Sequence, residues 1–145
     1  MPAAVLDLAP LADQLRPIAL KLSRQLRRES LAAGIGAQDA QLLGIVRKQP
    51  GIGVSELAEL EQVSRPSMSA HVKRLEEDGL LARGDAEGDR RRAPLDLTEA
   101  GRTALRTIRD SRTHWLEARL QRLTPAERDA LEAALPALER LVEPA

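Results

Sequence analysis

The hydrophobic pattern changes its period at Gly79, and this change constrains the fold more than any other feature of the chain. Before it, Met68, Val72 and Leu75 recur at spacings of four and three, which places their side chains on one face of a helix over residues 64–77. Gly79 is predicted to close that helix as a C′ glycine. The apolar segments that follow are too short for helices and are typical of strands.

Two short segments downstream of Gly79 are predicted to pair as an antiparallel hairpin. They are "LLARG", residues 80–84, and "APLDLT", residues 93–98. The loop that joins them carries three consecutive arginines, at 90–92. This loop is predicted to be the tip of the hairpin and to project from the surface.

The residues upstream predict two more helices in front of this hairpin unit. A helix over about 38–48 is followed by the turn "QPGIG", with room for a very short strand at Ile52. A short helix then begins with Ser55 as a plausible N-cap, and Ser64 caps the next helix, with Pro66 in its first turn. The turn "EQVS" is short enough to set two helices at a steep angle. The order of these elements predicts a winged helix-turn-helix.

Long helices are predicted on both sides of this unit. The first covers roughly residues 8–32, where Pro17 is expected to kink the helix or delay its start. The second covers roughly 99–122 and is capped by Thr98. A capping box, "TPAE" at 124–127, opens a further helix with leucines at helical spacing. The predicted fold class is therefore mainly α with a small β-wing.

The residue types that the chain lacks limit which side chains can form the core and which kinds of chemical site are possible. The 145 residues include no Cys, Phe or Tyr, one Trp and two His. The lack of cysteine excludes disulfides, thiol redox sensing and Cys-type zinc sites, and two distant histidines predict no metal site. The core must consist of Leu, Ala, Val and Ile in helices packed on helices. A bundle this small with long leucine stripes often needs a second subunit to cover them.

Charge and hydropathy limit the expected partners. The chain has 22 basic and 22 acidic residues, so any DNA binding must use locally focused positive charge. No apolar run approaches the roughly 20 residues of a membrane span, and the N-terminus lacks a secretory h-region. We therefore expect a cytoplasmic protein with no membrane partner. No Gly-rich phosphate loop, triad signature or apolar carboxylate pair occurs, so we predict no enzymatic activity and no cofactor.

The face of helix 64–77 opposite the apolar stripe suits the major groove of DNA. It is small and mostly uncharged, with cations at its edge. Pro66 and Ala70 are placed to approach thymine methyl groups. Ser69 is placed to reach a base edge, and Lys73 to reach guanine.

The start of the same helix suits phosphate binding. Ser64, Ser67 and the free N–H groups of the first turn can bind phosphate. Arg65 and Arg74 are expected to act on the DNA backbone. The alternative is an ordinary amphipathic helix with solvated cations, and the hairpin that follows favours DNA binding.

A hairpin beside such a helix is a wing, and this position explains the three arginines. Arg91 is predicted to enter the minor groove, which is narrow and strongly negative in A·T-rich DNA. Asp89 stands two residues earlier and is predicted to form a salt bridge with Arg91 that holds it ready. Arg90 and Arg92 are predicted to meet phosphates. The alternative is a solvated basic loop balanced by neighbouring acids.

Residues 54–101 resemble the MarR family of bacterial transcription regulators. The matching segments are "SELAE", "VSRPS", "KRLEEDGLL", the D-x-R of Asp89 and Arg91, and "LTEAG", and their spacings fit together. The long flanking helices and the late "LTPAE" also resemble the dimerisation region of the family. The resemblance therefore covers nearly the whole chain.

The resemblance implies a homodimeric transcriptional regulator that binds double-stranded DNA. Residues 1–36 would form an N-terminal dimerisation helix, 37–98 the DNA-binding winged helix-turn-helix, and 99–145 the C-terminal dimerisation helices. Most members of the family repress, and the operator would be an inverted repeat with half-sites about one helical turn apart. Many members release DNA when a small anion or phenolic compound binds between the dimer helices and the DNA-binding lobe.

The effector is the least specified of these implications. Aromatic residues often line the ligand pocket of the family, and Trp115 is the one aromatic residue available here, which makes it the candidate pocket residue. Packing of Trp115 in the core or the dimer interface, and a regulator without an effector, remain alternatives. His71 is interpreted as packed or solvent-facing rather than as a pH sensor. The alternative function is a winged helix that binds another protein and no specific DNA.

Overall fold

The structure is a computed structural model of the chain and describes residues 6–85 and 92–145. It is mainly helical with one small antiparallel sheet, which confirms the predicted fold class. Its elements are α1 (Ala9–Ala32), α2 (Ala37–Lys48), α3 (Val54–Glu61), α4 (Arg65–Glu77), β1 (Leu81–Arg83), β2 (Leu95–Leu97), α5 (Glu99–Leu120) and α6 (Pro125–Val142).

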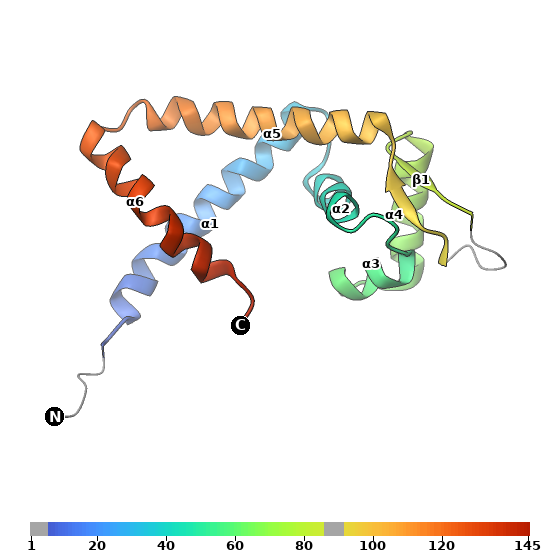
Figure 1. The fold of residues 1–145 in the computed structure, drawn as a ribbon, viewed down its shortest axis with the longest axis horizontal. Helices are drawn as coiled ribbons and strands as arrows, with labels where there is room; N and C mark the ends of the chain where they lie inside the picture. The colour runs from blue at the N-terminus through green and yellow to red at the C-terminus, as the bar shows by residue number, and fades with distance from the viewer. Residues whose placement is uncertain (1–5, 86–91) are drawn as a thin grey trace.

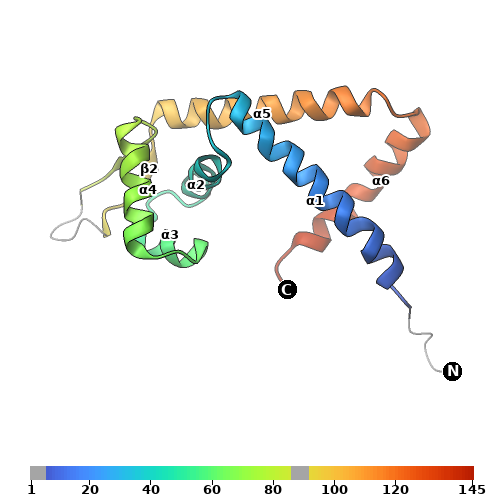
Figure 2. The same ribbon diagram turned by 180° about the vertical axis from the view of Figure 1, so that it is seen from behind.

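The elements divide into a compact lobe and two extended limbs (Figure 1). The lobe consists of α2, α3, α4, β1 and β2, and it lies at one end of the long helix α5. The limbs are α1 and α6, which extend away from the lobe in both views (Figures 1 and 2). Helix α5 therefore connects the two regions.

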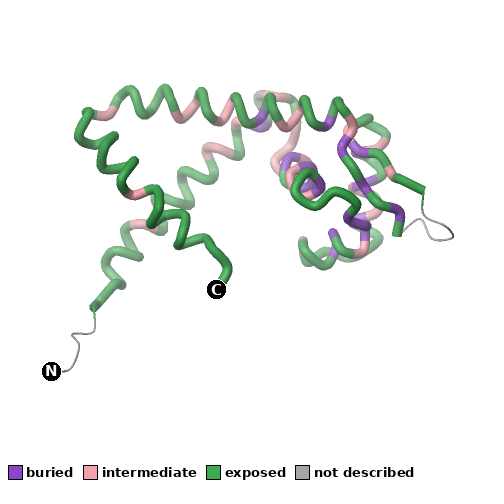
Figure 3. The backbone as a smooth tube through the Cα atoms, viewed as in Figure 1, coloured by how far each residue is buried: buried purple, intermediate pink, exposed green. Residues whose placement is uncertain are grey.

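The hydrophobic core lies in the lobe. Figure 3 shows buried segments gathered there, while the limbs are mostly exposed. Helix α4 contributes Met68, Val72 and Leu75, the three residues predicted to form its buried face, and the prediction is confirmed. The other members of the cluster are Leu42, Leu43, Val46, Ile52, Val54, Leu57, Ala58, Leu81, Leu95 and Leu97.

Strands β1 and β2 close one side of this core. They are antiparallel, with Leu81 opposite Leu97. Leu95 and Leu97 are buried while the residue between them is exposed, which is the alternation of a half-buried strand. The described residues form no strand at Ile52, where the sequence left room for a very short one. Ile52 nevertheless accepts a backbone hydrogen bond from Leu95 N at 3.0 Å, because a buried loop must satisfy its polar groups.

The limb α1 has almost the predicted range, Ala9–Ala32 against roughly 8–32. The helix continues through Pro17, so of the two effects expected there, a kink or a delayed start, the delayed start does not occur. Proline in the first turn removes an N–H that has no partner there, which favours this start. The C-terminal half of α1 packs on α5, where Arg112 Nε donates to the carbonyl of Leu26 at 3.0 Å and Ile108 is buried.

The limb α6 is well capped and poorly covered. The predicted capping box is present: Thr124 Oγ1 accepts from Glu127 N at 3.2 Å, and Glu127 Oε2 accepts from Thr124 N at 2.8 Å. No residue of α6 is buried within the chain. Its exposed leucines are Leu131, Leu135, Leu138 and Leu141.

Candidate nucleic-acid interface

Helices α3 and α4 form the helix-turn-helix of the lobe. Helix α3 is capped by Gly53 and begins at Val54, so the assignment of Ser55 as the N-cap is wrong. Val54 is buried in the core, and this packing sets the start of the helix. At its other end Gln62 takes a left-handed conformation with φ of 54°, which turns the chain sharply toward α4.

The start of α4 has the predicted cap. Ser64 is the N-cap, and its Oγ accepts from Ser67 N at 3.3 Å and donates to Ser67 Oγ at 2.8 Å. Pro66 lies in the first turn. Ser64, Arg65, Pro66 and Ser67 are all exposed, so the positive end of the helix dipole faces solvent. The exposed hydroxyl groups of Ser64 and Ser67 and the side chain of Arg65 are accessible to a phosphate at this end of α4.

The outward face of α4 matches the helical projection. Pro66, Ala70, Lys73 and Glu77 are exposed, and Ser69 is partly buried at the edge of this face. The three apolar residues on the opposite face are at most 2% exposed, which holds the helix by one side against the lobe. The free side of α4 is therefore a ridge that has small side chains at Pro66 and Ala70 and opposite charges at Lys73 and Glu77, and its shape suits a major groove.

One flank of α4 is tied to α2 by an acid that the sequence did not single out. Asp39 Oδ1 lies 2.6 Å from His71 Nε2, and the guanidinium of Arg74 donates to both oxygens of Asp39, at 2.7 and 3.0 Å. The hydrogen bonds from Arg74 lower the pKa of Asp39 below its ordinary value, and His71 adds a smaller effect in the same direction. Arg74 was predicted to act on the DNA backbone, and here its guanidinium is shared with a carboxylate.

The other flank of α4 is tied to the hairpin. Arg83 on β1 donates from Nε to Glu76 Oε1 at 2.6 Å, and both side chains are mostly buried. Gly79 closes α4 with φ of +76°, as predicted, because a left-handed residue there turns the chain into β1. The hairpin and α4 therefore behave as one unit.

The tip of the hairpin falls outside the described residues. Asp89, Arg90 and Arg91 lie there, so the predicted salt bridge and the minor-groove arginine stay predictions. Arg92 is described and is exposed at the foot of β2.

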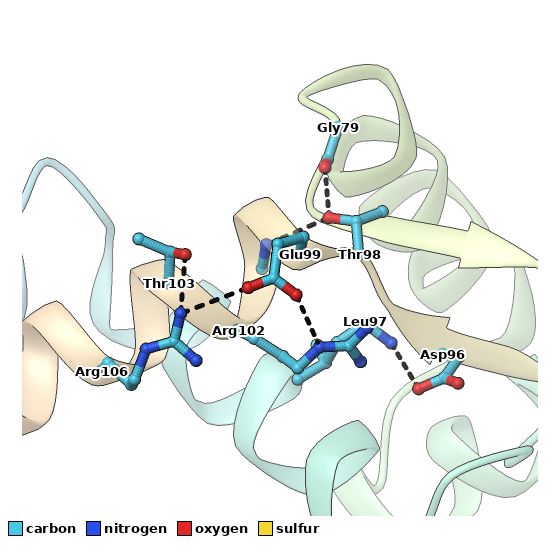
Figure 4. A network of polar contacts seen from close by, with 9 residues as sticks. Gly79, Asp96, Leu97, Thr98, Glu99, Arg102, Thr103 and Arg106 are labelled. Carbon is cyan, nitrogen blue, oxygen red and sulfur yellow. Dashed lines mark hydrogen bonds and ion pairs between the residues drawn. The ribbon is translucent and has the colours of Figure 1, made fainter.

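A compact joint connects the lobe to α5 (Figure 4). Thr98 caps α5 as predicted: its Oγ1 accepts from Gly101 N at 3.0 Å and also donates to the carbonyl of Gly79. A Cβ at Gly101 would overlap the carbonyl oxygen of Leu80, so only glycine allows this approach. Next to the joint, Arg106 and then Arg102 lower the pKa of Glu99.

A hollow of about 870 Å³ opens between α1, α2 and α5. Asp96 is the acid among its described lining residues, and apolar side chains such as Leu105 and Ile108 complete the wall. The excess of cations gives the hollow a positive field that suits an anion with an apolar body. The basic lining residues are Arg47, Lys48, Arg102, Arg106, Arg109 and Arg112.

Trp115 is not among the residues that line this hollow. It lies one position before Leu116, which does line it, and is partly buried with the guanidinium of Arg119 4.1 Å from its ring centroid. Its role as an effector-pocket residue stays a prediction. The described residues contain no group of three or more His, Cys, Asp or Glu side chains placed to hold a metal ion. None of the described helices combines the length and apolar character needed to cross a bilayer.

Comparison with known proteins identifies the chain. Residues 33–92, which cover the whole helix-turn-helix, match the model of the MarR family. A solved protein of Pseudomonas aeruginosa PA01, described as a transcriptional regulator, is 32% identical and superposes with a TM-score of 0.81 over 94% of this chain and 95% of its own. The chain belongs to the MarR family of transcriptional regulators.

Further relatives of this MarR-family chain agree over most of its length. An HTH-type transcriptional regulator of Mycobacterium tuberculosis is 29% identical over 135 residues, which are 93% of this chain and 94% of that protein. A mutant of MepR from Staphylococcus aureus, 18% identical, has the same fold with a TM-score of 0.69 over 92% of this chain and 98% of its own, and was solved bound to an oligodeoxyribonucleotide. As a member of the MarR family, the chain is a transcriptional regulator and not an enzyme.

Proposed function

We propose that this MarR-family chain is a repressor that binds a double-stranded inverted-repeat operator as a homodimer. The observation that carries the proposal is the form of α4, a capped helix held by one apolar face and exposing a small ridge on the other. MepR, which shares the fold, has been solved with DNA bound, and this supports the same use of the lobe here. An operator is part of the chromosome, so the protein acts in the cytoplasm.

Each lobe places α4 in a major groove. Pro66, Ala70 and Ser69 face base edges, and Lys73 at the border of the ridge reaches guanine. Ser64, Arg65 and Ser67, all exposed at the helix start, bind phosphates and set the register of the helix. The small side chains at positions 66 and 70 let the backbone of α4 approach the bases closely.

The hairpin tip follows the adjacent minor groove. In this proposal Arg91, oriented by Asp89, enters the groove, and Arg90 and Arg92 bind the flanking phosphates. The support comes from the foot of the hairpin, which the ion pair between Arg83 and Glu76 fastens to α4. A groove-inserted helix thereby brings the foot of the hairpin close to the duplex.

The limbs form the homodimer interface. Residues 1–36 and 99–145 of two subunits interleave, and 37–98 remain as the DNA-binding domain. Exposed apolar side chains along both limbs support this, since soluble monomers rarely leave such continuous stripes uncovered. The side chains that the partner would cover are Leu11, Ile18 and Leu22 on α1 and Leu131, Leu135, Leu138 and Leu141 on α6.

Binding to DNA from upstream of the protein's own gene tests this function. Fluorescence anisotropy against that duplex and a shuffled duplex of equal length and composition, at several salt concentrations, should show a sequence preference and a steep loss of affinity with salt. Lys73→Ala should weaken binding, whereas Lys21→Ala, which removes an exposed cation from a limb, should not. Weak association without sequence preference at every salt concentration would instead favour a protein-interaction module.

The cationic hollow is proposed as the effector site, for a small anion with an apolar body. Trp115 is the sole tryptophan and lies next to the lining residue Leu116, so intrinsic fluorescence should report binding there. Benzoate is expected to change the fluorescence and to weaken operator binding, and neutral benzamide of the same shape is not. Arg109→Gln should abolish the benzoate response. An equal response to both compounds would contradict an anion site.

A further inference from the structure

Helix α2 grips both helices of the helix-turn-helix with polar side chains from its first two turns. Asp39 holds His71 and Arg74 of α4 through three contacts of 2.6 to 3.0 Å. Two residues later, Gln41 donates from Nε2 to the carboxylate of Glu61 at the end of α3, at 2.9 and 3.2 Å. Helix α2, which is not part of the helix-turn-helix, therefore restrains both α3 and α4 on one side.

Asp39 and His71 are mostly covered, whereas Arg74 is more open, and the contacts use both oxygens of the carboxylate. The side chain of Asp39 is 17% exposed, that of His71 is 20% exposed and that of Arg74 is 54% exposed. Arg74 binds with its two terminal nitrogens to the two oxygens, which is the bidentate geometry that fixes an arginine most firmly. An arginine held in this way is poorly placed to follow a mobile phosphate.

The held residues alternate with the residues proposed to read DNA. His71 directly follows Ala70, and Arg74 directly follows Lys73. The packed apolar face of α4 already holds the helix to the lobe, and the Arg83–Glu76 pair restrains one flank. The bonds to Asp39 add a restraint on the other flank. Directional bonds to a fixed carboxylate resist rotation about the helix axis, because turning α4 would break their geometry.

We propose that Asp39 is a positioning residue for DNA recognition, which sets the rotation of α4 through His71 and Arg74, and that Arg74 is a strut rather than a phosphate contact. This role rests on the proposed binding of DNA by α4. Asp39 itself does not touch DNA, and its effect on affinity is transmitted through the two side chains that it holds.

The pairing also has an electrostatic consequence that can be measured. Arg74 and Asp39 carry opposite charges, so the pair contributes almost no net charge to the surface that meets phosphates. A side chain that neutralises a phosphate adds about 0.9 to the slope of log affinity against log salt. Lys73 should contribute to that slope, and Arg74 should not.

The test compares Asp39→Asn with Asp78→Asn in the full-length chain. Asp78 also raises the pKa of Arg74, but through charge alone and as a smaller cause than Asp39, so its substitution removes the same charge from the same neighbourhood without removing a bond. Asp39→Asn is expected to weaken operator binding by about three- to fivefold while leaving the shuffled duplex within about twofold of wild type. Asp78→Asn is expected to leave both affinities within about twofold.

Two further measurements separate positioning from a general loss of folding. The double variant Asp39→Asn with Arg74→Gln removes both charges of the pair and should leave the salt slope unchanged, while Lys73→Ala should lower it by about 0.9. In the double variant Asp39→Asn with Arg74→Gln, the loss of operator affinity should be close to that of Asp39→Asn alone, because both changes remove the same contact. Additive losses of operator affinity, or a lower salt slope for the double variant, would overturn the role of Arg74 as a strut.

The outcomes also distinguish this role from the proposed function. A wild-type chain without preference for the operator would overturn the function, and the role of Asp39 with it. A wild-type preference that Asp39→Asn retains in full would overturn the role of Asp39 alone.

Discussion

The lobe and the limbs use the same apolar residue types in opposite ways. In the lobe, apolar side chains from three helices and two strands converge, and Leu43, Leu57, Leu75 and Leu95 have no exposed surface. In the limb α6, leucines at similar spacing remain between 39% and 67% exposed. The leucine pattern alone does not distinguish the two cases. Where helices and strands of one chain converge, they bury each other's apolar side chains. An extended helix has no such neighbours, so its leucines stay exposed until another chain covers them.

Because of this difference, we expect the two regions to be stabilised in different ways. The lobe has the closed core that an independent folding unit needs, whereas α1 and α6 depend on what covers them. Changes in the lobe should therefore act at any protein concentration, and changes in the limbs should act through the partner.

Leu57→Ala should have the largest effect, because it removes a fully buried side chain from the centre of the lobe. We expect it to lower the free energy of unfolding by about 2–5 kcal/mol. Leu60→Ala, on the same helix at a position that is 54% exposed, is the matched control and should change little. Urea denaturation at two protein concentrations tests this, and a concentration-dependent effect of Leu57→Ala would contradict a self-contained lobe.

Gly101→Ala should have the next largest effect on stability, because Gly101 lies at the joint between the lobe and α5. The added methyl group would collide with the backbone carbonyl of Leu80, which cannot rotate away. Overpacking of this kind costs about 1–3 kcal/mol. Gly44→Ala, where no atom lies within 4 Å of the added Cβ, should be neutral or stabilising by up to about 1 kcal/mol. Thermal unfolding of both variants measures the contrast, and equal melting temperatures would count against a tight joint.

Leu135→Glu should act through the partner and leave the subunit fold unchanged. The side chain is 54% exposed in the single chain, so a second subunit would bury about half of it, worth roughly 1 kcal/mol per subunit. Analytical ultracentrifugation should show a dimer that dissociates more readily, with an unchanged circular dichroism spectrum. Glu132→Gln, an exposed change on the same helix, serves as the control. Dimers of undiminished strength would move the interface away from α6.

Asp39→Asn should have the smallest effect on stability, below about 1 kcal/mol, because Arg74 is 54% exposed and solvent screens the pair. The folded-state pKa of Asp39 is lowered, so its contribution is present above the ordinary aspartate value of 3.8 and is lost as the pH falls through the lowered folded-state pKa. The stability difference between wild type and Asp39→Asn should thus be constant near neutrality and shrink below pH 3.8. A difference that grows on acidification would contradict the pair.

Local signals in the sequence predicted the recognition unit well. The caps Ser64, Thr98 and Thr124 and the closing Gly79 all have their predicted roles, because each depends on the chemistry of a few neighbouring residues. The buried face of α4 followed from its periodicity alone. Ser55 failed as a cap for an instructive reason, since burial of Val54 in the core outweighed the capping preference of a serine two residues away from the true cap.

Contacts between residues far apart in the chain could not be predicted in this way. Asp39 is 32 residues from His71 and 35 from Arg74, and no local pattern in the sequence distinguishes it from the other acids of the chain. The same holds for the cationic hollow, whose arginines come from α2 and α5, and for Trp115, which lies beside the hollow without lining it.

What the sequence determined by itself is the order of the helices and the hairpin strands, the caps at Ser64, Thr98 and Thr124, the family resemblance and the outward face of α4, because short-range chemistry and periodicity specify these features. The tertiary structure alone decided which acid holds α4, where cations gather, and which leucine stripes remain uncovered. Those properties depend on distances between elements, and such distances exist only after the core of the lobe has packed and α5 has carried the limbs away from it.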